Sequence, residues 1–160
     1  MSEDRTHFEI KVPARPESVA RVRTKLLGWL AHRADVPGPS TGAVALAVSE
    51  AVANSARHAY GDGRGSVRVS AVLSPGRLDV CVEDSGKGFA PHADERSNGL
   101  GMMIIVRLAD EVTLHSDGAG TAVRLAFQLG TAADGDRVKR SGPRAMTRVL
   151  GAQRLDAAIH

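Results

Sequence analysis

Hydrophobic residues recur along the chain at two spacings, and each spacing predicts one type of secondary structure. Short segments with alternating apolar and polar residues, bounded by turn residues, are expected to be half-buried β-strands. These strands are predicted at residues 8–12, 66–73, 77–83, 112–115 and 122–129. Apolar residues spaced three to four positions apart instead predict amphipathic helices. The predicted helices are residues 17–34, residues 43–60 and a short apolar one at residues 102–109.

Residues that favour turns separate these segments and determine how they connect. Residues 74–76 (Ser-Pro-Gly) and residues 117–121 are each expected to close a β-hairpin. Residues 37–39 (Pro-Gly-Pro) break the chain before the second helix, which Ser40 or Thr41 can cap. The resulting order predicts an α+β fold: a two-layer α/β sandwich whose mixed, mostly antiparallel sheet is covered on one face by helices.

Composition limits the core and the class of protein. The chain has 160 residues, 42% of them apolar and only 3% aromatic, so we expect one domain with a core of Val, Leu, Ile and Ala. No apolar run approaches the roughly 18 residues of a membrane span, which predicts a soluble, cytoplasmic protein without a membrane partner. Cys81 is the single cysteine and lies in a predicted strand, so a buried small side chain is favoured over a reactive thiol.

The net charge of +3 is unevenly distributed. Residues 131–160 hold six basic and three acidic residues, whereas residues 1–130 are neutral. Because a nucleic-acid-binding domain usually carries a basic stripe on its folded part, direct nucleic-acid binding is not expected. The chain is therefore divided into a domain, residues 1–130, and a basic, flexible C-terminal tail, residues 131–160; a weak helix at residues 144–159 is the alternative for the tail.

A polar stripe runs along the second predicted helix. Glu50, Asn54 and His58 are spaced four residues apart and therefore share one helix face. A carboxylate and a carboxamide one turn apart can accept a proton and hold a hard cation through oxygen. A solvated outer face is the simpler alternative. The buried face is expected to contain Val44, Val48, Val52, Ser55 and Ala59.

Three glycine-rich segments follow. After the third strand, Asp84-x-Gly86-x-Gly88 would let a planar ligand dock by its edge, with the carboxylate accepting from an exocyclic amine; many surface turns look similar. Gly99-x-Gly101 is expected at the entrance of the third helix, where free N–H groups can bind phosphate, or where they form a simple cap. Thr121 enters the last strand, and its hydroxyl can reach a base or belong to an ordinary turn.

The order and spacing of these motifs, more than any single motif, resemble the GHKL or histidine-kinase-like ATPase superfamily, which includes gyrase, histidine kinases and MutL and has a Bergerat-type ATP-binding fold. Within it, the chain resembles the anti-sigma-factor serine/threonine kinases of the RsbW/SpoIIAB type. The segments that carry this second resemblance are Ser-Glu-Ala-Val-Ala-Asn at residues 49–54, His-Ala-Tyr at residues 58–60 and residues 95–101. The resemblance covers residues 7–129, so the tail has no counterpart in it.

The resemblance implies a role for each motif. Asn54 would hold Mg²⁺ at the triphosphate of ATP, Glu50 would act as general base, and Asp84 would recognise the adenine amino group with support from Thr121. Arg96 matches a lid arginine that approaches the terminal phosphate. The implied pocket and lid residues are Gly86, Gly88, Gly99, Leu100 and Gly101. The predicted lid, residues 90–98, is shorter than in many kinases of the superfamily.

The activity implied is that of an anti-sigma factor. Such a protein binds ATP and Mg²⁺, sequesters a sigma factor of RNA polymerase and phosphorylates a serine or threonine of an anti-anti-sigma (STAS-type) antagonist. A homodimer is also implied, and the first strand, which has no hairpin partner, is expected at or near a sheet edge where chains can pair. A kinase-inactive, ATP-gated partner-switching protein and an ATP-binding domain of another signalling complex are the alternatives.

Overall fold

The computed structural model describes residues 6–33, 36, 38–58, 64–86, 95–129, 146–150 and 153–157. Within them the chain forms three helices and seven strands. These are β1 (His7–Pro13), α1 (Pro16–Ala31), α2 (Gly38–His58), β2 (Ser66–Ser74), β3 (Arg77–Asp84), α3 (Glu95–Leu108), β4 (Glu111–Asp117), β5 (Gly120–Gln128), β6 (Met146–Leu150) and β7 (Gln153–Ala157). No helix of this described part is both long and apolar enough to cross a membrane.

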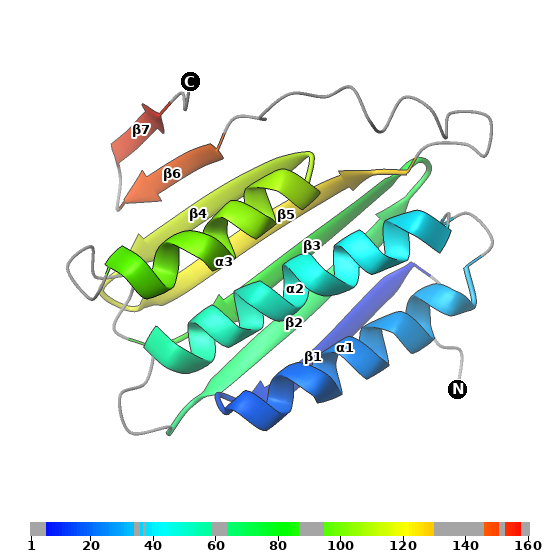
Figure 1. Cartoon of the computed structure of the whole chain (residues 1–160), viewed down its shortest axis with the longest axis horizontal. Coiled ribbons are helices and arrows are strands. Elements are labelled where there is room, and N and C mark those ends of the chain that lie inside the picture. Colours follow the sequence, from blue (N-terminus) through cyan, green and yellow to red (C-terminus); the bar gives the residue numbers. More distant parts are fainter. Residues whose placement is uncertain are drawn as a thin grey trace.

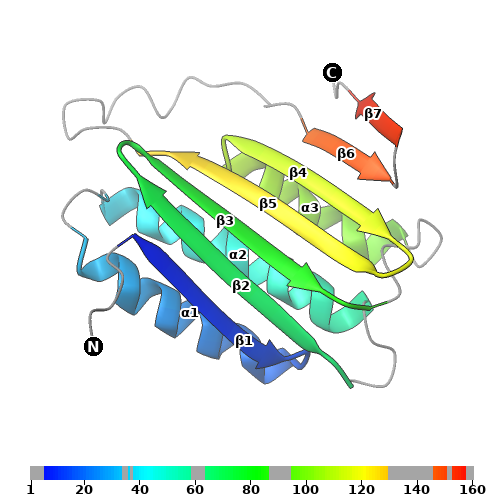
Figure 2. The same ribbon diagram turned by 180° about the vertical axis from the view of Figure 1, so that it is seen from behind.

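The strands form one sheet in the order β1-β2-β3-β5-β4-β6-β7. All neighbouring strands are antiparallel except β4 and β6, which are parallel. The three described helices cover one face of the sheet (Figure 1), and the opposite face carries no described helix (Figure 2). The predicted α+β sandwich with a mixed, mostly antiparallel sheet is therefore confirmed, as is the position of β1 at a sheet edge.

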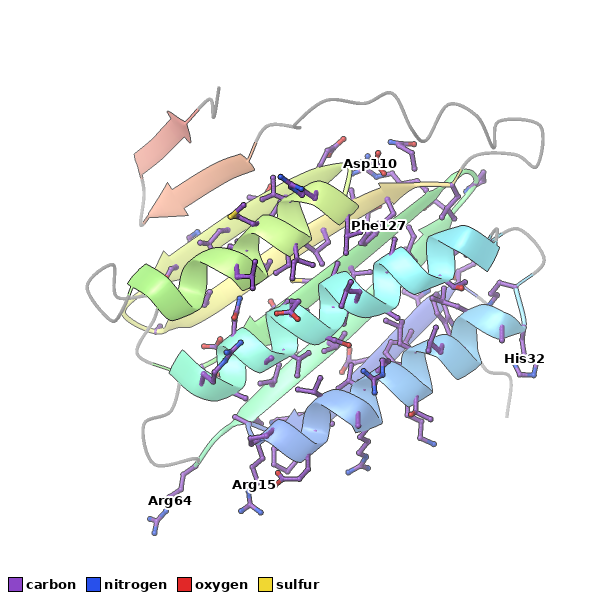
Figure 3. All side chains as sticks on the ribbon, in the orientation of Figure 1. Arg15, His32, Arg64, Asp110 and Phe127 are labelled. Atoms are coloured by element: carbon purple, nitrogen blue, oxygen red, sulfur yellow. The ribbon has the colours of Figure 1, made fainter. Side chains whose placement is uncertain are left out.

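Alternation along the strands produces the core. In β2 and β3, every second side chain is buried against the helices, because successive side chains of a strand point to opposite faces. Helix α2 lies between α1 and α3 (Figure 1) and buries its predicted face, including Val44, Val48 and Val52. The core is aliphatic as expected; Phe127 is the aromatic side chain among the buried residues described (Figure 3). Burial of one such aliphatic side chain contributes about 1.5–3 kcal/mol.

The starts of two helices differ from the predictions by several residues. Helix α2 already begins at Gly38, so Ser40 and Thr41 lie inside the helix and not at its N-cap position. Helix α3 begins at Glu95 rather than at residue 102. Each glycine inside a helix lowers the stability of the helix by about 1 kcal/mol relative to alanine, so the segment with Gly99 and Gly101 is expected to be a loop. The packing of α3 against α2 outweighs that preference.

The predicted alternative of a helix at residues 144–159 is wrong, because β6 and β7 occupy this segment. β6 pairs along the outer side of β4, from Val112 with Met146 to Ser116 with Leu150. An edge strand has unpaired backbone groups that can bond to any extended segment of the same chain. Such a long-range pairing produces no hydrophobic periodicity in the local sequence from which it could be predicted. The division of the chain at residue 130 and the mobility of the tail stay predictions.

Candidate functional site

The first part of the candidate site lies where α2 and α3 pack side by side above the sheet (Figure 1). Gly101 of α3 faces two polar side chains of α2: a Cβ atom added to Gly101 would lie 3.0 Å from Glu50 Oε2 and 3.2 Å from Asn54 Oδ1. Glu50 and Asn54 are both half-buried, which argues against a solvated outer stripe. The missing side chain at Gly101 thus brings the α3 backbone against a carboxylate and a carboxamide.

These two side chains supply oxygen atoms of the kind that hard cations prefer. Asn54 Oδ1 accepts a hydrogen bond from Arg57 Nη2 at 3.3 Å, and a carboxamide oxygen has a second lone pair for a cation. The described residues contain no group of three or more His, Cys, Asp or Glu side chains that could hold a metal alone. Mg²⁺ at nucleotide sites usually takes one or two protein oxygens, with phosphates and water completing its shell. The donor set therefore fits Mg²⁺ that arrives with a nucleotide.

The second part of the site is the carboxylate at the end of β3. Asp84 pairs across the sheet with Thr121 of β5 and is half-buried. Its carboxylate accepts a hydrogen bond from the Gly86 N–H group at 3.1 Å. Asp84 is thus held by a donor from its own loop. A half-buried carboxylate fixed in this way can recognise a single donor group of a ligand.

Burial raises the pKa of Asp84, and hydrogen bonding, chiefly from the Gly86 N–H group, opposes the rise only partly. Because the folded chain binds this proton more tightly than the unfolded chain, the stability of the fold decreases as the pH rises through the pKa of Asp84. The ionised carboxylate is therefore kept at a cost to stability. Such a cost is typical of carboxylates that serve a ligand or a reaction.

The backbone at the start of β5 approaches Asp84 closely. Gly120 has a φ of +156°, a conformation that L side chains rarely adopt, and a Cβ atom there would overlap the carbonyl oxygen of Asp84. The Thr121 hydroxyl is 3.3 Å from the Ser116 hydroxyl of β4. Thr121 lies directly across the sheet from Asp84, and the supporting role implied for it stays a prediction.

The structure describes the other predicted site residues only in part. Gly86 is buried in the turn after β3, whereas Gly88 lies outside the described residues. Arg96 and Gly99 belong to the first turns of α3, and Leu100 is exposed. The prediction that Gly99 and Gly101 lie at the helix entrance with free N–H groups is wrong, because α3 begins at Glu95. The side chains of Arg96 and His58 are outside the description.

Sequence reasoning assigned Ser55 only to the buried face of α2. The structure confirms this position, because Ser55 is buried with 7% of its surface exposed.

A hollow of about 320 Å³ lies on the opposite, helix-free face of the sheet. Its lining includes Arg77, which pairs with Asp79 and Glu111, and the half-buried Cys81. Because the sheet separates this hollow from Glu50 and Asn54, it is not part of the candidate site. Burial raises the pKa of the Cys81 thiol, which favours the unreactive role expected for it.

Comparison with known proteins agrees with this geometry. The sequence pattern of the histidine kinase-like ATPase domain matches residues 12–127. Serine-protein kinase RsbW of Bacillus velezensis is 31% identical over 150 residues, which cover 84% of this chain and 93% of that protein. RsbW of Bacillus subtilis is 30% identical over 152 residues, which cover 85% of this chain and 94% of that protein. RsbW of Listeria monocytogenes is 32% identical over 124 residues, which cover 68% of this chain and 78% of that protein. The chain belongs to the family of histidine kinase-like ATPase domains.

Proposed function

We propose that this protein is an anti-sigma factor with serine/threonine kinase activity: it binds ATP with Mg²⁺, sequesters a sigma factor and phosphorylates an anti-anti-sigma antagonist. The observation that carries the proposal is the contact of Gly101 with Glu50 and Asn54, in a chain whose relatives are serine-protein kinases. A half-buried carboxylate and an amide beside a glycine have the chemistry that phosphoryl transfer to a hydroxyl requires.

In this proposal, two ends of the site contribute to the binding of ATP. Asp84 would accept a hydrogen bond from the adenine amino group, and Thr121 would support that contact. Asn54 would hold Mg²⁺, which offsets the charge of the triphosphate when it is bound. Gly86, Gly88, Gly99, Leu100 and Gly101 would shape the pocket, and the Arg96 guanidinium would approach the terminal phosphate. These assignments rest on the family and on the positions described above.

Glu50 would act on the incoming hydroxyl. The serine or threonine oxygen of the antagonist forms a bond to the γ-phosphorus, the bond from that phosphorus to the bridging oxygen breaks, and ADP leaves with the electron pair. The hydroxyl proton passes to the Glu50 carboxylate. The position of Glu50 opposite Gly101 leaves no side chain of residue 101 between this carboxylate and the adjoining α3 backbone.

Radiolabelled ATP tests this proposal directly. Incubation of the protein with Mg·ATP and a candidate anti-anti-sigma protein should transfer label to a serine or threonine of that partner, and EDTA should stop the transfer. ATP binding without any transfer to the antagonist, even though the two proteins form a complex, would instead establish the kinase-inactive partner-switching protein. A chain that does not bind ATP would contradict both.

We also propose that the chain forms a homodimer through β1. The Thr6 carbonyl bonds to the Leu73 N–H of β2, so backbone groups of Glu9 and Lys11, which are odd-numbered, point to the outer edge. Antiparallel pairing of two β1 strands about Ile10 would place Glu9 of each chain opposite Lys11 of the other. Both side chains are exposed, and opposite charges in this position favour pairing.

Charge reversal at β1 provides the test. Glu9→Lys or Lys11→Glu alone should weaken the dimer roughly tenfold in sedimentation experiments, since each creates two like-charge pairs per dimer. The double variant Glu9→Lys/Lys11→Glu should restore it. A chain that stays monomeric at micromolar concentration would rule out the dimer, and a dimer lost only when residues 131–160 are removed would move the interface to the tail.

A further inference from the structure

Three large apolar side chains are exposed on α2 and α3, the helices that form the first part of the candidate site. Leu46 of α2 is 47% exposed, and Leu100 and Met103 of α3 are 67% and 54% exposed. In the described part of the chain, one other large apolar side chain is exposed: Val72, which lines the hollow on the opposite face of the sheet. Exposed apolar side chains therefore gather on the outer side of α2 and α3.

The outer face of α1 shows how a solvated helix of this fold is built. Its exposed long side chains include Arg21, Arg23 and Lys25, and none of the large apolar side chains described for α1 is exposed. Helix α3 departs from this pattern, because it buries Ile105 in the core and exposes Met103 on its outer face. A helix that is apolar all round is normally covered on all sides. We therefore expect a partner to cover the outer face of α3.

The exposed apolar side chains lie next to the proposed general base. Leu46 is one turn before Glu50 on α2, so the two side chains share one face of that helix. Leu100 directly precedes Gly101, which lies against Glu50. The two helices pack side by side and run in opposite directions (Figure 1). Exposed apolar side chains therefore flank the Glu50 carboxylate on both helices.

An exposed arginine adds a positive charge to this surface. Arg107 follows Met103 by four residues, so the two side chains are neighbours on the outside of α3. None of the ion pairs between described residues includes Arg107. Arginine is enriched among the residues that contribute most to protein–protein binding, and its guanidinium matches a carboxylate. A partner that covers Met103 can therefore present an acidic side chain to Arg107.

We propose that the phosphoacceptor protein docks on this surface, which we name the α2–α3 surface. It consists of Leu46, Leu100, Met103 and Arg107. The antagonist covers it with an apolar segment that carries an acidic residue, and this contact brings the serine or threonine of the antagonist to Glu50. The inference rests on the proposed function, because it assigns the surface to the protein substrate of the kinase.

The position of the surface favours the antagonist over a second copy of the chain. The acceptor hydroxyl has to come within about 3 Å of the Glu50 carboxylate. Because the sheet lies beneath α2, a protein that brings a hydroxyl to Glu50 has to cover exposed residues of α2 and α3. The proposed dimer uses the β1 edge of the sheet, whereas α3 lies on the β4 side (Figure 1). The two contacts can therefore exist together.

The test measures docking separately from ATP binding and from chemistry. The candidate anti-anti-sigma protein is titrated in the transfer assay with the full chain, and ATP affinity and binding of the same protein are measured by calorimetry. Met103→Glu and Leu46→Glu should each raise the KM for this protein, and its Kd, roughly five- to thirtyfold. Values of kcat and ATP affinity should stay near those of the wild type. Glutamate is a strong helix former, so both helices should be kept.

Three further variants serve as controls. Val72→Glu introduces the same charge at an exposed apolar residue on the opposite face of the sheet and should leave every value unchanged. Met103→Leu keeps an apolar side chain and should retain the wild-type KM. Arg107→Ala should raise the KM and make it less sensitive to salt, because an exposed charge pair is screened by ions.

Each other result overturns a defined statement. Unchanged KM and Kd in both glutamate variants, with label still transferred, would overturn the docking surface and leave the kinase activity intact. Weaker ATP binding in these variants would assign the surface to the nucleotide pocket, and weaker self-association in sedimentation would assign it to a second copy; both overturn the inference. Lower affinity for the sigma factor at an unchanged KM would overturn it as well.

Failure of the proposed kinase activity is distinguished by the binding measurement. A wild type that binds the anti-anti-sigma protein but transfers no label would overturn the kinase activity. In that case the docking surface stands if Met103→Glu weakens the complex, and it is overturned if the variant binds like the wild type. A wild type that neither binds nor phosphorylates this protein would overturn the proposed function and the inference together.

Discussion

Replacement of Glu50 by glutamine should lower phosphotransfer by about 10²–10⁴-fold while ATP affinity stays close to that of the wild type. Glutamine has nearly the same shape but cannot take the proton of the incoming hydroxyl, and loss of one general base typically has an effect of this size. Single-turnover transfer of label from ATP to the antagonist, measured beside calorimetric ATP affinity, separates the chemical step from binding.

Glu83→Gln provides the control for this experiment. Glu83 belongs to β3 and lines the hollow on the helix-free face, so the same change of carboxylate to amide occurs on the far side of the sheet. Its transfer rate should equal that of the wild type. Undiminished phosphorylation by Glu50→Gln would contradict the assignment of the base and would leave Glu50 as a residue of the α2–α3 contact.

The second large effect is expected from Asn54→Ala, which should abolish the part of ATP affinity that depends on Mg²⁺. The variant removes the amide oxygen that faces Gly101 and also the acceptor of the Arg57 hydrogen bond. A hydrogen bond or ligand contact with a charged group contributes about 1.5–3 kcal/mol, so the loss should be at least roughly tenfold. Calorimetry with Mg²⁺ and with EDTA measures it directly.

The matched control is Gln128→Ala, which removes an exposed amide at the end of β5. It should bind Mg·ATP like the wild type. Asn54→Ala should keep the melting temperature of the free chain near that of the wild type, because Asn54 is only half-buried. Binding of Mg·ATP by Asn54→Ala at wild-type affinity would show that the metal is held elsewhere.

The fold was predictable where the local pattern agrees with the final packing. The alternation in residues 66–73 and 77–83 marked β2 and β3, and the turn residues between them gave the hairpin in which Gly76 adopts a φ of +71°. The start of α3 was missed because Gly99 and Gly101 suggest a loop when read alone. Only the facing helix, with Glu50 and Asn54 beside Gly101, shows why a residue without a side chain belongs inside this helix.

Long-range contacts explain what else was missed. The strands β6 and β7 depend on the free side of β4, which is about thirty residues earlier in the chain. Likewise, the motifs that contain Asn54, Asp84 and Thr121 could be recognised one by one, but the pairing of Asp84 with Thr121 forms only when the sheet assembles. Sequence spacing therefore indicated the candidate residues, and tertiary packing determines which of them lie together.

Asp84 ends the strand β3, which lies between β2 and β5, inside the sheet and away from its edges. Interior strands usually open only in global unfolding, so their amide protons exchange most slowly with solvent. A ligand bonded to Asp84 is consequently linked to the unfolding of the whole domain and not to a local opening. Because such a ligand binds the folded chain and not the unfolded chain, it should raise the melting temperature by an amount that increases with its affinity and concentration. Thermal-shift measurements can therefore serve as a screen for nucleotides and for inhibitors of this site.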